Sequence, residues 1–315
     1  MEERKLIRLG NSSFAIALPK DWVDKAGLKK GDKVFVVPDS NGRLFIEANF
    51  QGNKEAPALE LNVENKEPDF IKKYLHAAYI NGYDKMHFKG SKEFRKTIKD
   101  LVKNYVSLEI VDSNEKEDVV KDFFDMQESK YESFVKRIDN NLREMFEVIL
   151  NELQKKKIDD SVIKEIKEID KSVNKFYFLC SRLFIKGIDN PALLSTLKMD
   201  GSSLFNNWWI AFNHEAIGDG LKSVAQNANS LDIKDKKALL EILDKLSKAH
   251  LESMEAFYNN EHEKAHGIIS HTLKIREDID KLGSQNHKAL KMAHALEIIE
   301  RNIYQNAKMI FHMNV

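Results

Sequence analysis

Residues 160–188 read DSVIKEIKEIDKSVNKFYFLCSRLFIKGI, and this stretch decides how the rest of the chain is interpreted. Its apolar side chains recur at helical spacing, among them Ile166, Ile169 and Val173. It holds no proline, and its only glycine is Gly187, near its end. The pattern predicts one long helix that buries one face.

Similar segments fill the chain from about residue 120 onward, where strand signals vanish. We expect six helices, at roughly 122–156, 160–188, 192–229, 235–258, 261–282 and 286–313. The connections between them hold only two to six residues, which makes sequential helices antiparallel neighbours. Six such helices predict two three-helix bundles, over residues 120–230 and 233–315.

The first part of the chain has a different pattern. Residues 1–50 alternate short apolar runs with turn residues, which predicts short strands such as Leu6–Leu9 and Val34–Val37. So few short strands make a marginal core, and such a unit usually needs a partner chain. Residues 55–118 alternate strand and helix periods, which predicts a small βαβαβ middle domain. No glycine-rich phosphate loop occurs there, so we do not expect a nucleotide site.

Composition limits the function classes. The chain has 50 Lys and Arg and 50 Asp and Glu, so DNA could be bound only through a local patch. Residues 1–33 hold eight basic and five acidic side chains, and our candidate DNA-binding residues there are Arg4, Lys5, Arg8 and Lys20. The single cysteine, Cys180, cannot form an internal disulfide. No run of 18 apolar residues occurs, which leads us to expect a cytoplasmic protein without membrane insertion.

Catalytic motifs are missing, so we do not expect an enzyme. No Gly-x-Ser-x-Gly turn and no GxxxxGK[ST] loop occur. Glu263 and His266 form a single Glu-x-x-His pair, whereas a di-iron bundle needs that pair on two helices. His262 and His266 share a helix face, but the other histidines follow no fixed spacing, and we interpret them as ordinary helix residues.

Acidic side chains on the second and third expected helices give the sharper signal. Glu215 and Asp219 continue an apolar stripe four residues apart, and Asp170 and Asn174 repeat that spacing. A carboxylate in a buried stripe is costly unless it is paired or bound to an ion. The four residues therefore form a candidate site for a divalent or iron-type metal ion in the first bundle. The alternative is two ordinary solvated pairs.

The N-terminal motifs resemble the AbrB/SpoVT family. They are residues 4–10 (RKLIRLG), 18–20 (LPK) and 26–32 (AGLKKGD), and they cover nearly all of that small domain. The resemblance implies a swapped-hairpin barrel made by two chains that binds DNA.

The helical part resembles PhoU, a phosphate-uptake regulator built from two three-helix bundles. Its acidic hallmark stands here as residues 215–219 (EAIGD), and residues 170–177 (DKSVNKFY) resemble its other acidic motif, with Asn174 where an acid is usual. This resemblance implies metal clusters on the bundle surfaces and a role in phosphate signalling. In the second bundle, Arg276 and Arg301 stand at acidic positions of the pattern. There we expect salt bridges, including Arg301 with Glu297, and no metal.

Together these features favour a homodimeric, non-enzymatic transcriptional regulator of phosphate uptake or metabolism. The main alternative is a signalling adaptor that docks on a phosphate transporter or a sensor kinase, with the N-terminal unit serving only for dimerisation. A metalloenzyme is a third, less favoured class.

Overall fold

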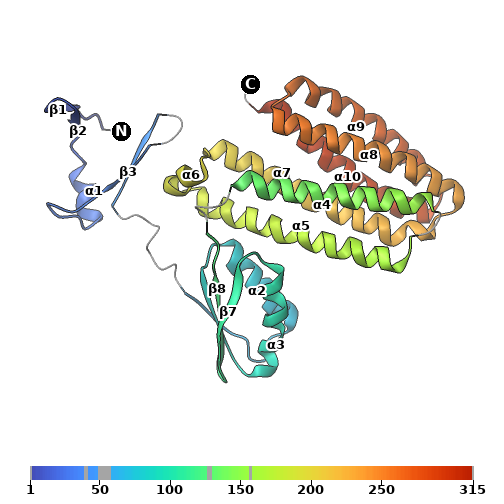
Figure 1. Ribbon diagram of the computed structural model, residues 1–315, viewed down its shortest axis with the longest axis horizontal. Coiled ribbons are helices and arrows are strands. Elements are labelled where there is room, and N and C mark those ends of the chain that lie inside the picture. Colours follow the sequence, from blue (N-terminus) through green and yellow to red (C-terminus); the bar gives the residue numbers. More distant parts are fainter. Residues whose placement is uncertain (1, 39–41, 49–57, 126–129, 156–157, 314–315) are drawn as a thin grey trace. The chain divides into compact units, whose positions relative to one another are not determined.

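The computed structural model describes residues 2–38, 42–48, 58–125, 130–155 and 158–313 (Figure 1). The chain divides into two compact units, Met1–Lys54 and Glu55–Val315. The first contains short strands and one short helix, and the second is dominated by long helices. The expected fold class, mainly α with a small β N-terminal part, is confirmed.

The N-terminal unit consists of two small hairpins and a helix between them. Its elements are β1 (Ile7–Leu9), β2 (Ser13–Ala15), α1 (Lys20–Lys25), β3 (Phe35–Pro38) and β4 (Leu44–Glu47). β1 pairs antiparallel with β2 and places Arg8 opposite Phe14, and β3 pairs antiparallel with β4. Gly10 turns the first hairpin with a φ of 71°, a conformation that glycine adopts without strain.

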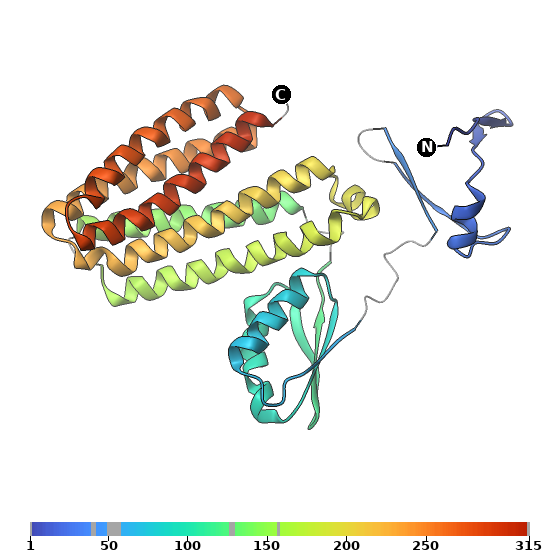
Figure 2. The ribbon, with the colours of Figure 1, turned by 180° about the vertical axis from the view of Figure 1, so that it is seen from behind.

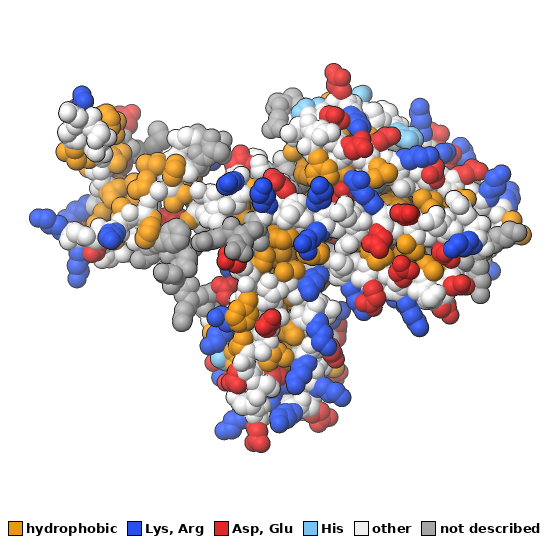
Figure 3. Space-filling model, in the orientation of Figure 1, with side chains coloured by type: hydrophobic (Ala, Val, Ile, Leu, Met, Phe, Trp, Pro, Cys, Tyr) orange, Lys and Arg blue, Asp and Glu red, His pale blue; other side chains and the backbone are white. Residues whose placement is uncertain are grey.

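This unit has almost no core of its own. Val37 is its one buried hydrophobic residue among those described. Phe14 is 62% exposed and Leu44 59% exposed, and hydrophobic side chains gather on the surface of this unit in Figure 3. A swapped-hairpin barrel would need a second chain to cover them, so that part of the expectation stays a prediction.

The second unit begins with a small sheet covered by two helices. Its elements are β5 (Leu59–Asn62), α2 (Pro68–Ile80), β6 (Lys85–Lys89), α3 (Lys92–Leu101), the 3₁₀ turn η2 (Val102–Asn104), β7 (Leu108–Ser113) and β8 (Glu117–Asp122). The strand order is β5-β6-β8-β7, with β5 and β6 parallel and the other pairs antiparallel. The βαβαβ expectation missed β8, which inserts between β6 and β7.

Seven α-helices follow in the part of the chain that the structure describes. They are α4 (Tyr131–Gln154), α5 (Asp160–Gly187), α6 (Pro191–Leu197), α7 (Gly201–Asn227), which the 3₁₀ turn η3 (Ala228–Ser230) extends, α8 (Ile233–Asn259), α9 (His262–Gly283) and α10 (His287–His312). The helix expected at 122–156 begins only at Tyr131, and residues 126–129 and 156–157 lie outside the described residues. The helix expected at 192–229 is two helices. The break falls where Lys198 adopts a φ of 55° and the Asp200 side chain accepts a hydrogen bond from the Ser203 N–H at 2.7 Å.

The long helices lie side by side in two sets of three (Figure 2). α4, α5 and α7 contact one another, as do α8, α9 and α10. α7 also packs on α10 and α4 on α8, so that one continuous apolar core runs through both sets. Gly220 permits the close approach of α7 and α10, because a Cβ added there would lie 2.6 Å from Ile299 Cγ1.

A buried arginine joins the small sheet to the bundle. Arg182 on α5 is 1% exposed at its side chain and forms ion pairs with Asp84 and, at 2.8 Å, with Asp122. Its guanidinium also donates to the Tyr79 carbonyl and lies over the Tyr79 ring. Lys186, one turn further along α5, pairs with Asp84 at 2.9 Å. These contacts fix α5 against the small domain, where Phe178 of α5 also packs on the apolar cluster beneath the sheet.

Candidate functional site

The candidate DNA-binding residues all lie on the surface of the N-terminal unit. Arg4, Lys5, Arg8 and Lys20 are exposed. Arg4 pairs with Glu2, and Arg8 Nε donates to the Gly10 carbonyl at 3.2 Å. Lys20 is the first residue of α1. Arg8 lies in β1, while Arg4 and Lys5 lie in the segment that leads into it, so these three cations share one stretch of chain.

The candidate metal residues come together on α5 and α7, as their spacing predicted, but around a lysine. Lys222 Nζ lies 2.7 Å from Asp170 Oδ2 and also pairs with Asp219 Oδ1. Asn174 Nδ2 donates to the Asp170 carbonyl at 3.1 Å. An ammonium thus lies between two of the carboxylates that were expected to hold a metal ion. Lys222 follows Asp219 by three residues on the same helix, a spacing that the sequence interpretation overlooked.

Glu215 is the carboxylate that this lysine leaves unpaired. It makes no hydrogen bond to any other residue in the part of the chain that the structure describes. Burial raises its pKa to about 7, and repulsion from Asp219 and Asp170 adds to the effect. Burial also raises the pKa of Asp170, whose Oδ1 is buried without a hydrogen-bond partner among the described residues. The pair Asp170 and Glu215 is therefore short of positive charge even with Lys222 present.

The metal hypothesis for these residues fits the structure only in part. The orphaned Asp170 oxygen and the charge deficit favour an added cation. However, among the described residues these carboxylates do not form a group of three with ligand atoms within 4.8 Å of one another. A metal ion here would require Lys222 to move aside.

The second bundle contains a salt bridge, but it joins Arg276 to Glu300 instead of Arg301 to Glu297. Arg276 on α9 donates to Glu300 Oε2 on α10 from Nε at 3.0 Å and from Nη2 at 2.7 Å. Glu300 is 1% exposed. Arg301 forms no ion pair with Glu297 within the described residues, so the expected i,i+4 pair is wrong. Residue 300, one position before Arg301, faces the bundle interior, and Arg301 faces solvent.

A buried polar cluster at the junction of the two sets of helices escaped the sequence analysis. Asp139 on α4, His214 on α7 and His250 on α8 have ligand atoms within 4.8 Å of one another. His250 Nε2 lies 2.9 Å from Asp139 Oδ1, and the Tyr258 hydroxyl donates to Asp139 Oδ2 at 3.2 Å. Arg143 donates to both oxygens of Asp139, at 2.9 and 2.8 Å. These residues lie up to 119 positions apart, and no local pattern connects them.

This cluster has the donor types of a metal site but the bonding of a hydrogen-bond network. Four donors occupy the Asp139 carboxylate, and the Arg143 guanidinium already balances its charge. Burial would raise the pKa of Asp139, but hydrogen bonds from His250 and Arg143 outweigh that effect and hold the pKa well below its usual range. Burial lowers the pKa of His214 to about 3, so this ring is neutral. We assign the cluster a role in joining α4, α7 and α8.

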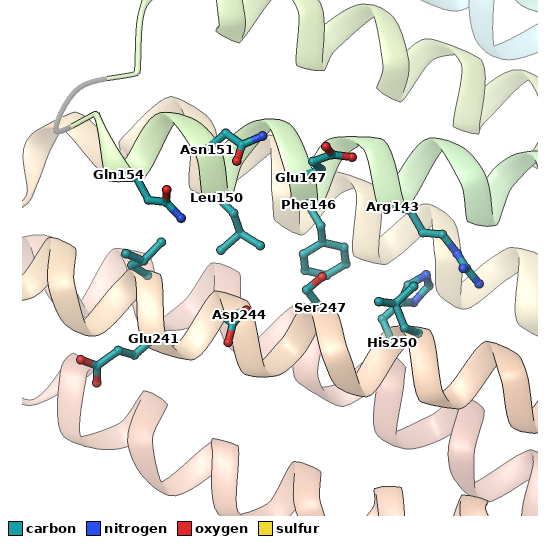
Figure 4. A pocket seen from close by; sticks show the side chains of 12 residues that line it. Arg143, Phe146, Glu147, Leu150, Asn151, Gln154, Glu241, Asp244, Ser247 and His250 are labelled. Carbon is teal, nitrogen blue, oxygen red and sulfur yellow. The ribbon is translucent and has the colours of Figure 1, made fainter.

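Two pockets border these groups. One is a groove of about 650 Å³ between α4 and α8, at whose end Arg143 and His250 lie (Figure 4). The other, of about 470 Å³, lies between α2 and the helices α5 and α7 and is lined by Glu215, Asp219 and Asn174 among others. The second pocket thus contains three of the four candidate metal residues.

The remaining histidine expectation concerns α9. His262 Nδ1 lies 3.0 Å from the Ile310 carbonyl oxygen, and the His266 ring lies 5.6 Å from that of Phe311. Both imidazoles therefore lie near residues of α10.

Among the described residues, no helix is both long and apolar enough to cross a membrane. No curated protein matches the chain, and no solved structure does. A family model described as "Antidote-toxin recognition MazE, bacterial antitoxin" matches residues 7–49. That match spans β1 to β4, the whole set of elements in the N-terminal unit. The N-terminal unit is therefore similar to this family of antitoxin domains, and the match supports an AbrB-like domain there.

Proposed function

We propose that this protein is a dimeric, DNA-binding transcriptional regulator whose helical unit receives the signal. The family match of residues 7–49 is the observation that carries the proposal. It is supported by the exposed apolar side chains of the N-terminal unit, such as Phe14 and Leu44, which a second chain would cover. The resemblance to AbrB implies a dimer that binds DNA, and this unit contains two hairpins with one helix between them.

The DNA contacts follow from charge. Arg4, Lys5 and Arg8 of each chain would bind phosphates or base edges, and Lys20 would add a cation at the start of α1. Arg4 would exchange its exposed partner Glu2 for a phosphate, a small cost because exposed ion pairs are weak. Dimerisation would double the number of cations on one surface, which compensates for the neutral net charge of the chain.

The signal that we propose is phosphate status, and this finer part depends on the resemblance of residues 215–219 to the PhoU motif. The proximity of Asp170 on α5 to Glu215 and Asp219 on α7 supports it. Metal binding by these residues and Asn174 belongs to the same proposal. Oxygen donors of this kind suit Mg²⁺, Mn²⁺ or Ca²⁺, with iron allowed by the resemblance. Replacing Lys222 by Ala should strengthen metal binding, measured by elemental analysis, because it removes the competing ammonium.

Selection of bound duplexes from a random DNA pool by the full chain tests the function directly. We expect enrichment of a sequence with two related half-sites, because a symmetric dimer reads symmetric DNA. A pool that stays random after repeated rounds, with no duplex retained at low salt, would favour the adaptor alternative. In that case phosphate transporter or kinase components would be the partners to test.

A further inference from the structure

The pocket between α2 and the bundle contains charged groups of opposite sign. Lys72 and Lys73 lie on α2, and Glu215 and Asp219 lie on α7, two helices that both pack on α5. Lys171 of α5 also lines the pocket. A small cation would be attracted only by the carboxylates, and a small anion only by the lysines. The pocket therefore suits a ligand that carries an anionic group at one end and hydrogen-bond donors at the other.

Most of these charges already have partners. Lys73 pairs with Asp69 at 2.8 Å, and Lys171 pairs with Glu168 at 2.6 Å. Asp219 pairs with Lys222. Lys72 forms no ion pair, and Glu215 no hydrogen bond, with any other described residue. These two groups are the free cation and the free acceptor that a ligand would meet.

Aromatic side chains also line the pocket. The His76 and Phe178 rings lie edge to face with their centroids 4.3 Å apart, and the Tyr105 ring lies 5.6 Å from Phe178. All three residues line the space. A volume of about 470 Å³ falls in the range of sites for drug-sized molecules, larger than a bare oxyanion needs. A planar ring between the anionic group and the donor edge would fit such a lining.

A carboxylate accepts hydrogen bonds and donates none, which selects among ring ligands. Guanine presents an N–H and an NH₂ side by side on its pairing edge, so both donors can reach one carboxylate. Adenine places an acceptor beside its NH₂ group, and that acceptor would face a carboxylate oxygen. We propose that this pocket binds a guanine mononucleotide, with its phosphate against Lys72 and its donor edge against Glu215.

This inference goes beyond the proposed function by naming an effector, and it applies to the chain with no metal ion at Glu215, since one carboxylate cannot serve both. No glycine-rich loop is needed because Lys72 takes the phosphate. The test is calorimetric titration of the metal-free full chain at pH 8, where Glu215 is ionised, with guanosine monophosphate, adenosine monophosphate, guanosine and inorganic phosphate. We expect saturable binding of guanosine monophosphate, at least tenfold tighter than binding of the other three. Binding is measured without DNA, so failure here is distinct from failure of the DNA-binding proposal.

Two variants test separately the contact to the base and the contact to the phosphate. Glu215→Gln should weaken the binding of guanosine monophosphate at least tenfold and remove the preference over adenosine monophosphate. Lys72→Glu should weaken the binding of guanosine monophosphate at least tenfold and leave the affinity for guanosine unchanged. The matched control is Lys92→Glu, an exposed lysine at the start of α3 that does not line this pocket, and it should bind like the parent.

Three results would overturn the assignment. They are equal binding of the guanine and adenine nucleotides, equal binding of inorganic phosphate alone, and full affinity in Glu215→Gln. Absence of any nucleotide binding at millimolar concentration would overturn it as well. Circular dichroism of each variant at the assay temperature confirms that the chain is folded.

Discussion

Glu215 is a half-buried acid whose environment opposes its charge. Its pKa of about 7 lies above the unfolded value of 4.5, so the folded state holds the proton more tightly. The resulting stabilisation is complete below pH 4.5 and is lost as the pH rises through 7. At pH 8 the ionised group therefore destabilises the fold, and Glu215→Gln should raise the free energy of unfolding by about 1–2 kcal/mol after solvent screening.

Urea unfolding at pH 8 and pH 5 measures this effect. The increase in the free energy of unfolding of Glu215→Gln should be present at pH 8. It should largely vanish at pH 5, where Glu215 is protonated in the folded parent chain. Glu144→Gln, at an exposed position on α4, is the control and should change little at either pH. A loss of stability at pH 8 in the Glu215 variant would mean that the carboxylate has a partner there, such as a bound metal ion.

His214 should make the protein sensitive to mild acid. Its folded pKa of about 3 lies below the unfolded value of 6.5, so only the unfolded chain takes up this proton between those values. Stability from this group is constant above pH 6.5 and falls as the pH drops toward 3. At pH 5 the loss should reach about 2 kcal/mol.

The variant His214→Gln tests this, because its loss of stability on acidification can be compared with that of the parent. Its stability at pH 7.5 will itself be lower, but its further loss between pH 7.5 and pH 5 should be smaller than that of the parent by about 2 kcal/mol. Chemical unfolding at both pH values gives the comparison. Parallel losses in the two proteins would show that His214 becomes protonated without cost in the fold.

Sequence reasoning at this scale succeeded where the relevant spacing is local. The i,i+4 spacing of Glu215 and Asp219 predicted a shared face with Asp170, and the structure places them together. It failed for Lys222 because charged residues at i+3 are common and carry no signal of burial. The cluster around Asp139 could not be found, because His250 lies 111 residues away and only the tertiary fold joins them.

Replacing each of two helix glycines by alanine should change stability in opposite directions. A Cβ at Gly220 would lie 2.6 Å from Ile299 Cγ1 and 3.2 Å from the Ala295 carbonyl oxygen, whereas a Cβ at Gly267 on α9 would meet nothing within 4 Å. Gly220→Ala should therefore destabilise the chain by about 1–3 kcal/mol through overpacking. Gly267→Ala should stabilise it by up to about 1 kcal/mol, because alanine favours the helix.

Thermal unfolding of both variants gives opposite shifts if this account of α7 and α10 is correct. An unchanged melting temperature in Gly220→Ala would show that the two helices can separate at no cost. The Gly267 variant serves as the control for the effect of the substitution itself.

Two features were missed in the sequence for different reasons. β8 contains only Val119 and Val120 as apolar residues, and its buried Asp118 is neutralised by Arg95 of α3. A charged residue in a buried strand has no local signature, since its partner lies 23 residues away. The break between α6 and α7 was missed because apolar spacing continues across Lys198, and only the backbone reveals the left-handed turn.

At the scale of the whole molecule, the N-terminal unit should make the protein an obligate dimer. Phe14 is 62% exposed in a single chain, so an interface that buries it cannot accept a charge. Phe14→Glu should convert the full chain from dimer to monomer in sedimentation equilibrium. Val111→Glu, at a 47% exposed position on β7 in the other unit, should remain dimeric. A monomeric parent chain at micromolar concentration would contradict the prediction.

The central claim is that this chain binds DNA through its N-terminal unit. The most direct test is the affinity of the full chain for a selected duplex across a series of salt concentrations. The account predicts that the logarithm of the binding constant falls linearly with the logarithm of salt. In the triple variant Arg4→Ala, Lys5→Ala, Arg8→Ala, binding should be weaker and the slope smaller by about 0.9 for each phosphate that the variant no longer neutralises. Binding that ignores salt, or a triple variant with unchanged affinity and slope, would contradict it.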